Sequence, residues 1–130
     1  MIMYNYLVQQ IKKSIDIKNK LLENREILDE IVQISNVCIN AYKNNKKILI
    51  AGNGGSAADA QHIAGELVNK FYFDRAGLAA FALTTDTSIL TAIGNDYGYE
   101  KLFSRQIQAN GDKGDVSVIR ANAASPALSK

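Results

Sequence analysis

The sequence predicts an α/β fold in three layers, with a parallel β-sheet between helices and further helices before it. Three observations support this prediction. From residue 46 onward, short apolar runs alternate with helical patterns, which is the order of parallel βαβ units. A glycine-rich turn separates the first apolar run from the helix that follows it. The segment 1–43 contains neither glycine nor proline, which favours uninterrupted helix.

Residues 1–43 are expected to form two helices that separate near Glu23–Asn24. The apolar positions of the two helices are Leu7, Ile11, Ile15 and Leu22, and then Ile27, Leu28, Ile31, Ile34, Val37 and Cys38. This is more apolar surface than one small domain needs to bury, so packing against another subunit is expected. The alternative is a helical hairpin that covers one end of the sheet.

The segment Lys46–Phe71 is central to the prediction. The apolar run Ile48–Ala51 is typical of a short, buried parallel strand. The glycines of Gly52–Gly55 permit unusual backbone angles and let the backbone approach a ligand closely. Ser56 is the expected N-cap of the next helix, and Asp59 follows three residues later in a capping-box position.

A strand, a glycine turn and a helix N-terminus in succession can bind an anion. The N–H groups of the turn and the positive end of the helix dipole would both face a phosphate. However, the turn has neither the Gly-Lys-Ser/Thr of a Walker motif nor the spacing of a dinucleotide fingerprint, and the charge of Asp59 would compete with an anion. Phosphate binding and a purely structural turn both remain compatible with this stretch.

The helix after the turn is amphipathic. Its apolar positions, which are expected to pack on the sheet, are Ala60, Ile63, Ala64, Leu67, Val68 and Phe71. His62 and Glu66 lie four residues apart on the opposite face, where both could contact one metal ion or one substrate. An ordinary exposed pair is the alternative, because a zinc site requires three or four ligands.

The remaining elements are short. In chain order they are a buried strand at Leu78–Leu83, a short helix through Ile93 with its N-cap within Thr84–Thr87, a turn at Gly94–Gly98, a helix at Tyr99–Ala109 and a third strand from Val116. The glycine turn and the segment Thr84–Thr87 both follow strands. They are therefore expected at the carboxyl edge of the sheet, where ligands bind in folds of this class.

Composition restricts the classes of function. The chain has 15 basic and 13 acidic residues and a net charge of +2, which does not indicate nucleic-acid binding. No run approaches the roughly 20 apolar residues of a membrane-spanning helix, and no signal-peptide pattern is evident. The one cysteine, Cys38, allows no disulfide within the chain and is expected to pack as a small apolar residue. We expect a cytoplasmic protein with no membrane or nucleic-acid partner.

Two stretches resemble a known family. AGNGGSAADAQHIAGEL at Ala51–Leu67 and LTTDTSILTAIGNDYGYE at Leu83–Glu100 are similar to the sugar isomerase (SIS) domain family, and within it to the phosphoheptose isomerases. The resemblance covers residues 41–116. It implies one SIS domain of flavodoxin-like type over residues 1–130, with N-terminal helices at 1–45, an αβ core at 46–116 and an atypical tail at 117–130.

The resemblance also implies an activity. Phosphoheptose isomerases interconvert sedoheptulose 7-phosphate and D-glycero-D-manno-heptose 7-phosphate by enediol-type proton transfer, in heptose synthesis for lipopolysaccharide or capsule. The substrate-binding residues that it implies are Asn53, Gly54, Gly55, Ser56, Glu66, Asn95 and Asp96. It implies zinc with His62 and Glu66 as two ligands, Glu66 as the catalytic base, and a homotetramer assembled through the N-terminal helices. On spacing alone, Asn95 and Asp96 would be turn residues.

Helix geometry places Ser56 and Glu66 about 15 Å apart along the axis, at about 1.5 Å per residue. A seven-carbon sugar phosphate would have to lie stretched along the polar face of the helix to contact both. The other arrangement is a pocket shared between subunits, with the phosphate held by one chain and Glu66 supplied by another. We favour the shared pocket.

The sequence departs from the family pattern after Val116. Family members continue into a Ser/Thr-rich phosphate loop and a C-terminal helix that carries a Gln and a His. Residues 117–130 contain neither feature, and Ser125 and Ser129 do not replace the loop. The 130-residue chain, which resembles the product of a truncation or frameshift, is therefore expected to be inactive or nearly so. The alternatives are a non-catalytic SIS protein that binds phosphosugars or one that associates with a replication initiator; the presence of Glu66 argues against the latter.

Overall fold

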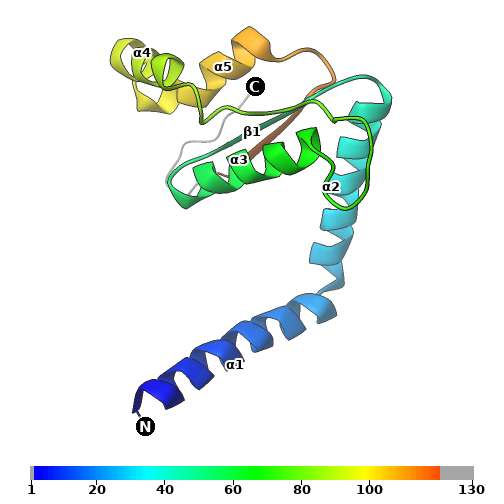
Figure 1. Cartoon of the computed structure of the whole chain (residues 1–130), viewed down its shortest axis with the longest axis vertical. Coiled ribbons are helices and arrows are strands. Elements are labelled where there is room, and N and C mark those ends of the chain that lie inside the picture. Colours follow the sequence, from blue (N-terminus) through cyan, green and yellow to red (C-terminus); the bar gives the residue numbers. More distant parts are fainter. Residues whose placement is uncertain (1, 121–130) are drawn as a thin grey trace. The chain divides into compact units, whose positions relative to one another are not determined.

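A computed structural model of the chain describes residues 2–120. Its elements are α1 (Ile2–Glu23), α2 (Arg25–Lys43), β1 (Ile48–Gly52), α3 (Gly55–Val68), β2 (Ala80–Ala82), α4 (Thr87–Tyr97), the 3-10 helix η1 (Tyr99–Lys101), α5 (Leu102–Asn110) and β3 (Val116–Arg120) (Figure 1). The chain divides into two compact units, residues 1–37 and residues 38–130. Ser125 and Ser129 lie outside the described residues.

The first unit is helical, as predicted. The break falls at Asn24, whose side-chain Oδ1 accepts a hydrogen bond from the N–H of Ile27 at 3.1 Å and so caps the start of α2. No residue of α1 is buried, and its apolar residues, Leu7 and Ile11 among them, are exposed. Packing of this apolar surface against another subunit stays a prediction.

The second unit is built on a three-stranded parallel sheet with the order β2-β1-β3. In its register Ile48 of β1 lies opposite Ala80 of β2 and Val116 of β3. Every residue of β1 is buried. The predicted parallel sheet is thus confirmed, and β1 is its centre because both neighbouring strands pair with it.

Side chains alternate across β1 and build a separate core on each face of the sheet. On one face Ile48 and Ile50 pack with Ala60 and Ala64 of α3, and the partly buried residues around them are Cys38, Tyr42, Leu67, Ala82 and Val116. On the other face Leu49, Ala51 and Leu83 pack with Phe103, Ile107 and Ile119. The three-layer arrangement is therefore confirmed, with α3 and the end of α2 on one side and α5 on the other (Figure 1).

Three predicted elements differ from the structure. The helix expected at Tyr99–Ala109 begins as the 3-10 helix η1 and is α-helical only from Leu102. The second strand is limited to Ala80–Ala82, inside the predicted 78–83. Phe81 is 55% exposed rather than buried, because β2 is an edge strand that pairs with β1 on one side only.

The predicted turn at Gly94–Gly98 is wrong. Asp86 caps α4 by accepting the N–H of Ile89 at 2.9 Å, and the helix then continues to Tyr97. It ends at Gly98, whose φ of 92° is open chiefly to glycine.

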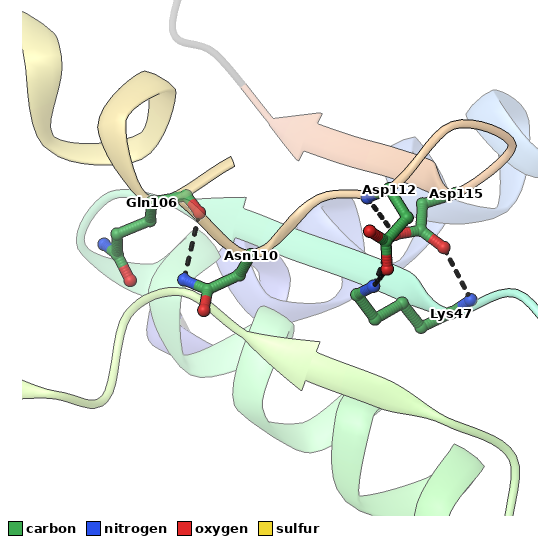
Figure 2. A network of polar contacts seen from close by, with 5 residues as sticks. All are labelled: Lys47, Gln106, Asn110, Asp112 and Asp115. Atoms are coloured by element: carbon green, nitrogen blue, oxygen red, sulfur yellow. Dashed lines mark hydrogen bonds and ion pairs between the residues drawn. The ribbon is translucent and has the colours of Figure 1, made fainter. Parts of the chain in front are cut away.

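A polar cluster joins the starts of β1 and β3 (Figure 2). The Nζ of Lys47 lies 2.7 Å from a carboxylate oxygen of both Asp112 and Asp115. The backbone N–H of Lys47 donates to Oδ1 of Asp115 at 3.0 Å. The backbone N–H of Asp112 donates to Oδ2 of Asp115 at 2.7 Å. The Asp115 side chain is only 4% exposed, so these bonds supply the partners that a buried carboxylate requires.

The same contacts set the acidity of Asp115. Burial alone would raise its pKa, but the hydrogen bond with the Lys47 ammonium and the two backbone N–H donors outweigh burial and lower the pKa from 3.8 to about 2. The cluster raises the pKa of Lys47, chiefly through its hydrogen bonds to Asp112 and Asp115.

Among residues 2–120, no helix combines the length and the apolar character that crossing a membrane requires.

The lowered pKa of Asp115 predicts a specific pH dependence of stability. A carboxyl group whose pKa is lower in the folded state stabilises the fold above its unfolded pKa, and this contribution disappears as the pH falls through the folded pKa. Urea unfolding followed by circular dichroism should show that the free energy of unfolding of the wild type declines as the pH falls from 3.8 to about 2. Asp115→Asn should be less stable at pH 7 and should lack this part of the decline.

Asp112→Asn is the matched control, because the Asp112 side chain is 74% exposed although it contacts the same Lys47. It should change stability much less. Equal effects of the two substitutions would contradict the assignment of the stabilising contact to Asp115.

Candidate functional site at the carboxyl edge of the sheet

The strand β1 delivers the chain to a tight turn at the carboxyl edge of the sheet. At Gly52 a Cβ atom would lie 2.7 Å from both the Cβ and the carbonyl oxygen of Ser56. No side chain larger than hydrogen fits there without moving the backbone. Glycine at this position therefore allows the first turn of α3 to pack directly against the end of the strand.

The prediction that Ser56 caps α3 is wrong. The helix begins at Gly55, its N-cap is Gly54 with φ of 55°, and no side chain caps it. The N–H of Ser56 instead donates to the carbonyl of Asn53, and that of Ala57 to the carbonyl of Gly54, both at 3.0 Å. Glycine at a positive φ lets the backbone close the turn by itself. Helix geometry leaves the N–H of Gly55 without an acceptor inside the helix.

A cavity of about 410 Å³ lies beside this turn. We call it the turn cavity; it is lined by Gly52, Asn53, Gly54, Ala57, Thr84, Leu90, Thr91, Gly94, Tyr99, Leu102 and Phe103. Asn53, Gly54 and Thr84 therefore lie where sequence analysis expected ligand contacts, whereas Gly55 and Ser56 do not line the cavity. None of the lining side chains is charged, so attraction for an anion would come from N–H groups and the helix dipole.

His62 and Glu66 lie on a different surface. The His62 Nε2 and the Glu66 Oε1 are 3.7 Å apart, and their side chains are 78% and 38% exposed. They line a second hollow of about 360 Å³, here called the helix hollow, together with Ile63, Leu67, Lys70, Phe71, Tyr72, Phe73 and Arg75. The two hollows share no lining residue, so one chain does not bring Asn53 and Glu66 into one cavity.

The apolar side of α3 also differs from the prediction. Ala60 and Ala64 are buried and Leu67 packs on the core, as expected. Ile63 and Val68 are 46% and 53% exposed, and Phe71, beyond the end of the helix, is 58% exposed. The expectation that all six apolar residues pack on the sheet is wrong for these three. Ala60, Ala64 and Leu67 pack with the core that contains Ile48 and Ile50 of β1, whereas Ile63 and Phe71 line the helix hollow.

Asn95 and Asp96 do not join either hollow. Both are exposed in the last turn of α4, and the Nδ2 of Asn95 donates to Oδ1 of Asp96 at 2.8 Å. Neither residue lines the turn cavity or the helix hollow. Their assignment to the substrate site stays a prediction.

The described residues do not complete a zinc site. His62 and Glu66 supply two donors, and no group of three metal-binding side chains occurs between residues 2 and 120. Zinc in proteins is held by three or four protein ligands. The two residues fit part of a ligand set only.

Two residues that contribute to the candidate site, Tyr99 and Arg75, were not predicted from the sequence. The Tyr99 hydroxyl donates to Oδ1 of Asn53 at 2.8 Å, which links η1 to the glycine turn. The Arg75 guanidinium donates to the carbonyls of Leu67 and Glu66 at 2.9 and 3.1 Å, and so holds the C-terminal turn of the helix that carries Glu66. A basic residue just beyond a helix is a recognisable signal for such a contact, but nothing in the spacing links residue 99 to residue 53.

Comparison with known proteins identifies the family. The model of the SIS domain family matches residues 11–127 of this chain. This chain belongs to the SIS domain family. The matched range begins before the 41–116 expected from the motifs, because the N-terminal helices carry only a periodic pattern that motifs do not represent. It also ends later, within the tail 117–130 that the motifs did not cover.

Other SIS proteins are closely similar. Phosphoheptose isomerase of Aneurinibacillus thermoaerophilus is 61% identical over 89% of this chain and 59% of its own length. Phosphoheptose isomerase 2 of Campylobacter jejuni is 60% identical over 88% of this chain and 57% of its own length. The solved structure of phosphoheptose isomerase GmhA from Neisseria gonorrhoeae superposes with a TM-score of 0.83 at 41% identity, over 95% of this chain and 63% of that one. This SIS chain thus spans less than two thirds of the length of these relatives.

The contact at Gly52 predicts opposite effects for two glycine substitutions in this SIS domain. Gly52→Ala should destabilise the fold by about 1–3 kcal/mol or more, the cost of overpacking, because its Cβ would meet the Ser56 backbone. Gly65→Ala, in the interior of α3 with open space around a Cβ, should stabilise it by about 0.5–1 kcal/mol. Thermal unfolding checks both, and a tolerated Gly52→Ala would refute the close contact.

Proposed function

We propose that this SIS protein is an isomerase that interconverts sedoheptulose 7-phosphate and D-glycero-D-manno-heptose 7-phosphate. The observation that carries the proposal is the turn cavity, where Asn53 and Gly54 line a hollow at the carboxyl end of the central strand. This is the ligand-binding edge of open α/β sheets. The similarity to phosphoheptose isomerases supports the choice of substrate.

The proposed chemistry requires a phosphate anchor, a base and groups that stabilise the enediol. Backbone N–H groups of Gly54 and Gly55, near Ser56 at the start of α3, are proposed to hold the phosphoryl end. Glu66 is proposed as the base, and Asn95 and Asp96 as a second substrate contact. Glu66 is partly exposed in the helix hollow, where a substrate could reach its carboxylate.

The complete site is proposed to form between subunits. The turn cavity and the helix hollow have no lining residue in common, which supports a site in which one copy of the chain contributes Asn53 and another contributes Glu66. The exposed apolar residues of α1 and α2 offer surface for assembly. We propose a homotetramer on this basis.

Three further assignments belong to the proposal. His62 and Glu66 would supply two ligands of a zinc ion, the other donors coming from outside residues 2–120. The protein would act in the cytoplasm, and its product would enter heptose synthesis for lipopolysaccharide or capsule.

Binding and conversion of sedoheptulose 7-phosphate test the proposal separately. Calorimetric titration should show that the chain binds sedoheptulose 7-phosphate more tightly than unphosphorylated sedoheptulose. Weak conversion is expected, and Glu66→Gln should lower it by about 10²–10⁴-fold, the range for loss of a general base, while binding is largely retained.

Glu100→Gln is the matched control, because Glu100 is exposed on η1 and lines neither hollow. It should convert the substrate like wild type. Binding that is unaffected by the phosphate group would contradict the proposed anchor. Binding without any conversion dependent on Glu66 would favour a phosphosugar-binding SIS module instead.

A further inference from the structure

We propose that Tyr99 is a positioning residue, which fixes the Asn53 carboxamide so that its NH₂ group serves as a hydrogen-bond donor in the turn cavity. This inference rests on the proposed function, because it concerns how the same cavity recognises a sugar phosphate. The argument depends on one contact, the 2.8 Å hydrogen bond from the Tyr99 hydroxyl to Oδ1 of Asn53.

The contact joins two parts of the chain that are 46 residues apart. Asn53 follows β1, and Tyr99 begins η1 after α4. Both residues line the turn cavity. The hydrogen bond therefore spans two segments of the cavity wall, and Tyr99 contacts Asn53 without sharing an element with it.

The backbone at Gly98 brings Tyr99 to this place. Gly98 has φ of 92°, a left-handed backbone conformation that residues with a side chain rarely adopt. Glycine is thus needed where α4 ends and the chain turns into η1. Asp86 fixes the other end of α4 by capping it, so both ends of the helix before Tyr99 are defined by particular residues.

The chemical consequence follows from the asparagine side chain. A carboxamide has one oxygen acceptor and an NH₂ group with two donor hydrogens, and it can rotate to exchange them. Because the Tyr99 hydroxyl donates to Oδ1, the amide is held in the orientation that leaves the NH₂ group for other acceptors. The oxygens of a sugar phosphate are acceptors, and no charged side chain lines the cavity to replace this donor.

Tyr99→Phe tests the inference, because it removes the hydroxyl and keeps the ring. Tyr97→Phe is the matched control. Tyr97 is also exposed, but its ring lies against the Arg105 guanidinium at 4.0 Å, a contact that does not need the hydroxyl. Two readouts are used, the side-chain amide signals of Asn53 in ¹H–¹⁵N NMR spectra and the affinity for sedoheptulose 7-phosphate.

In the free protein, Tyr99→Phe should shift the Asn53 side-chain amide signals, and Tyr97→Phe should leave them in place. In the titration, Tyr99→Phe should weaken binding about fivefold, the effect of losing one ordinary hydrogen bond, and Tyr97→Phe should not. Unmoved Asn53 signals in Tyr99→Phe, or unchanged affinity, would overturn the inference.

The two proposals fail in different ways. If the wild-type chain does not bind sedoheptulose 7-phosphate, the proposed function is contradicted and the role of Tyr99 in recognition falls with it, whatever the Asn53 signals show. If wild type binds and Tyr99→Phe binds equally well, the proposed function stands and only the role of Tyr99 is lost.

Discussion

The close packing of α3 against the end of β1 at Gly52 is the constraint on which the candidate site depends. Because position 52 carries no side chain, the Ser56 backbone can lie where a Cβ would otherwise be. The chain must then reverse within two residues, and Gly54 allows this with its positive φ. Asn53, between the two glycines, is thereby placed at the wall of the turn cavity.

The central strand has different roles at its two ends. At its start, Lys47 is bound to Asp112 and Asp115, which fixes the register between β1 and β3 (Figure 2). At its carboxyl end the glycine turn leaves backbone groups near a cavity of uncharged side chains. The charged contacts that stabilise the sheet are therefore separated from the place where a ligand would bind, so a charged ligand would not compete with them.

Much of the fold could be predicted from the sequence, because its signals are local. The apolar run at Ile48–Ala51 and the glycines after it define a buried strand and a turn, and the absence of glycine and proline before residue 44 defines the helices. The exact end of α4 could not be predicted, because Gly94 lies inside a helix that the Asp86 cap and packing sustain past it. Turn-forming composition at Gly94–Gly98 was outweighed by this context.

The site was harder to predict than the fold, because it depends on contacts between distant residues. His62 and Glu66 form the pair that their spacing indicated, yet spacing along one helix does not tell which cavity they face. The Tyr99–Asn53 hydrogen bond joins residues 46 positions apart, and no sequence pattern indicates a contact at that separation. The lowered pKa of Asp115 likewise arises from its tertiary contacts with Lys47 and Asp112, which local sequence does not specify.

The most direct test of the central claim is a crystal structure of the chain with sedoheptulose 7-phosphate bound. Our account places the phosphorus atom beside the glycine turn, with phosphoryl oxygens within hydrogen-bonding distance of the N–H groups of Gly54 and Gly55. A phosphoryl group bound instead at Lys70 in the helix hollow, with the glycine turn free of ligand, would contradict it.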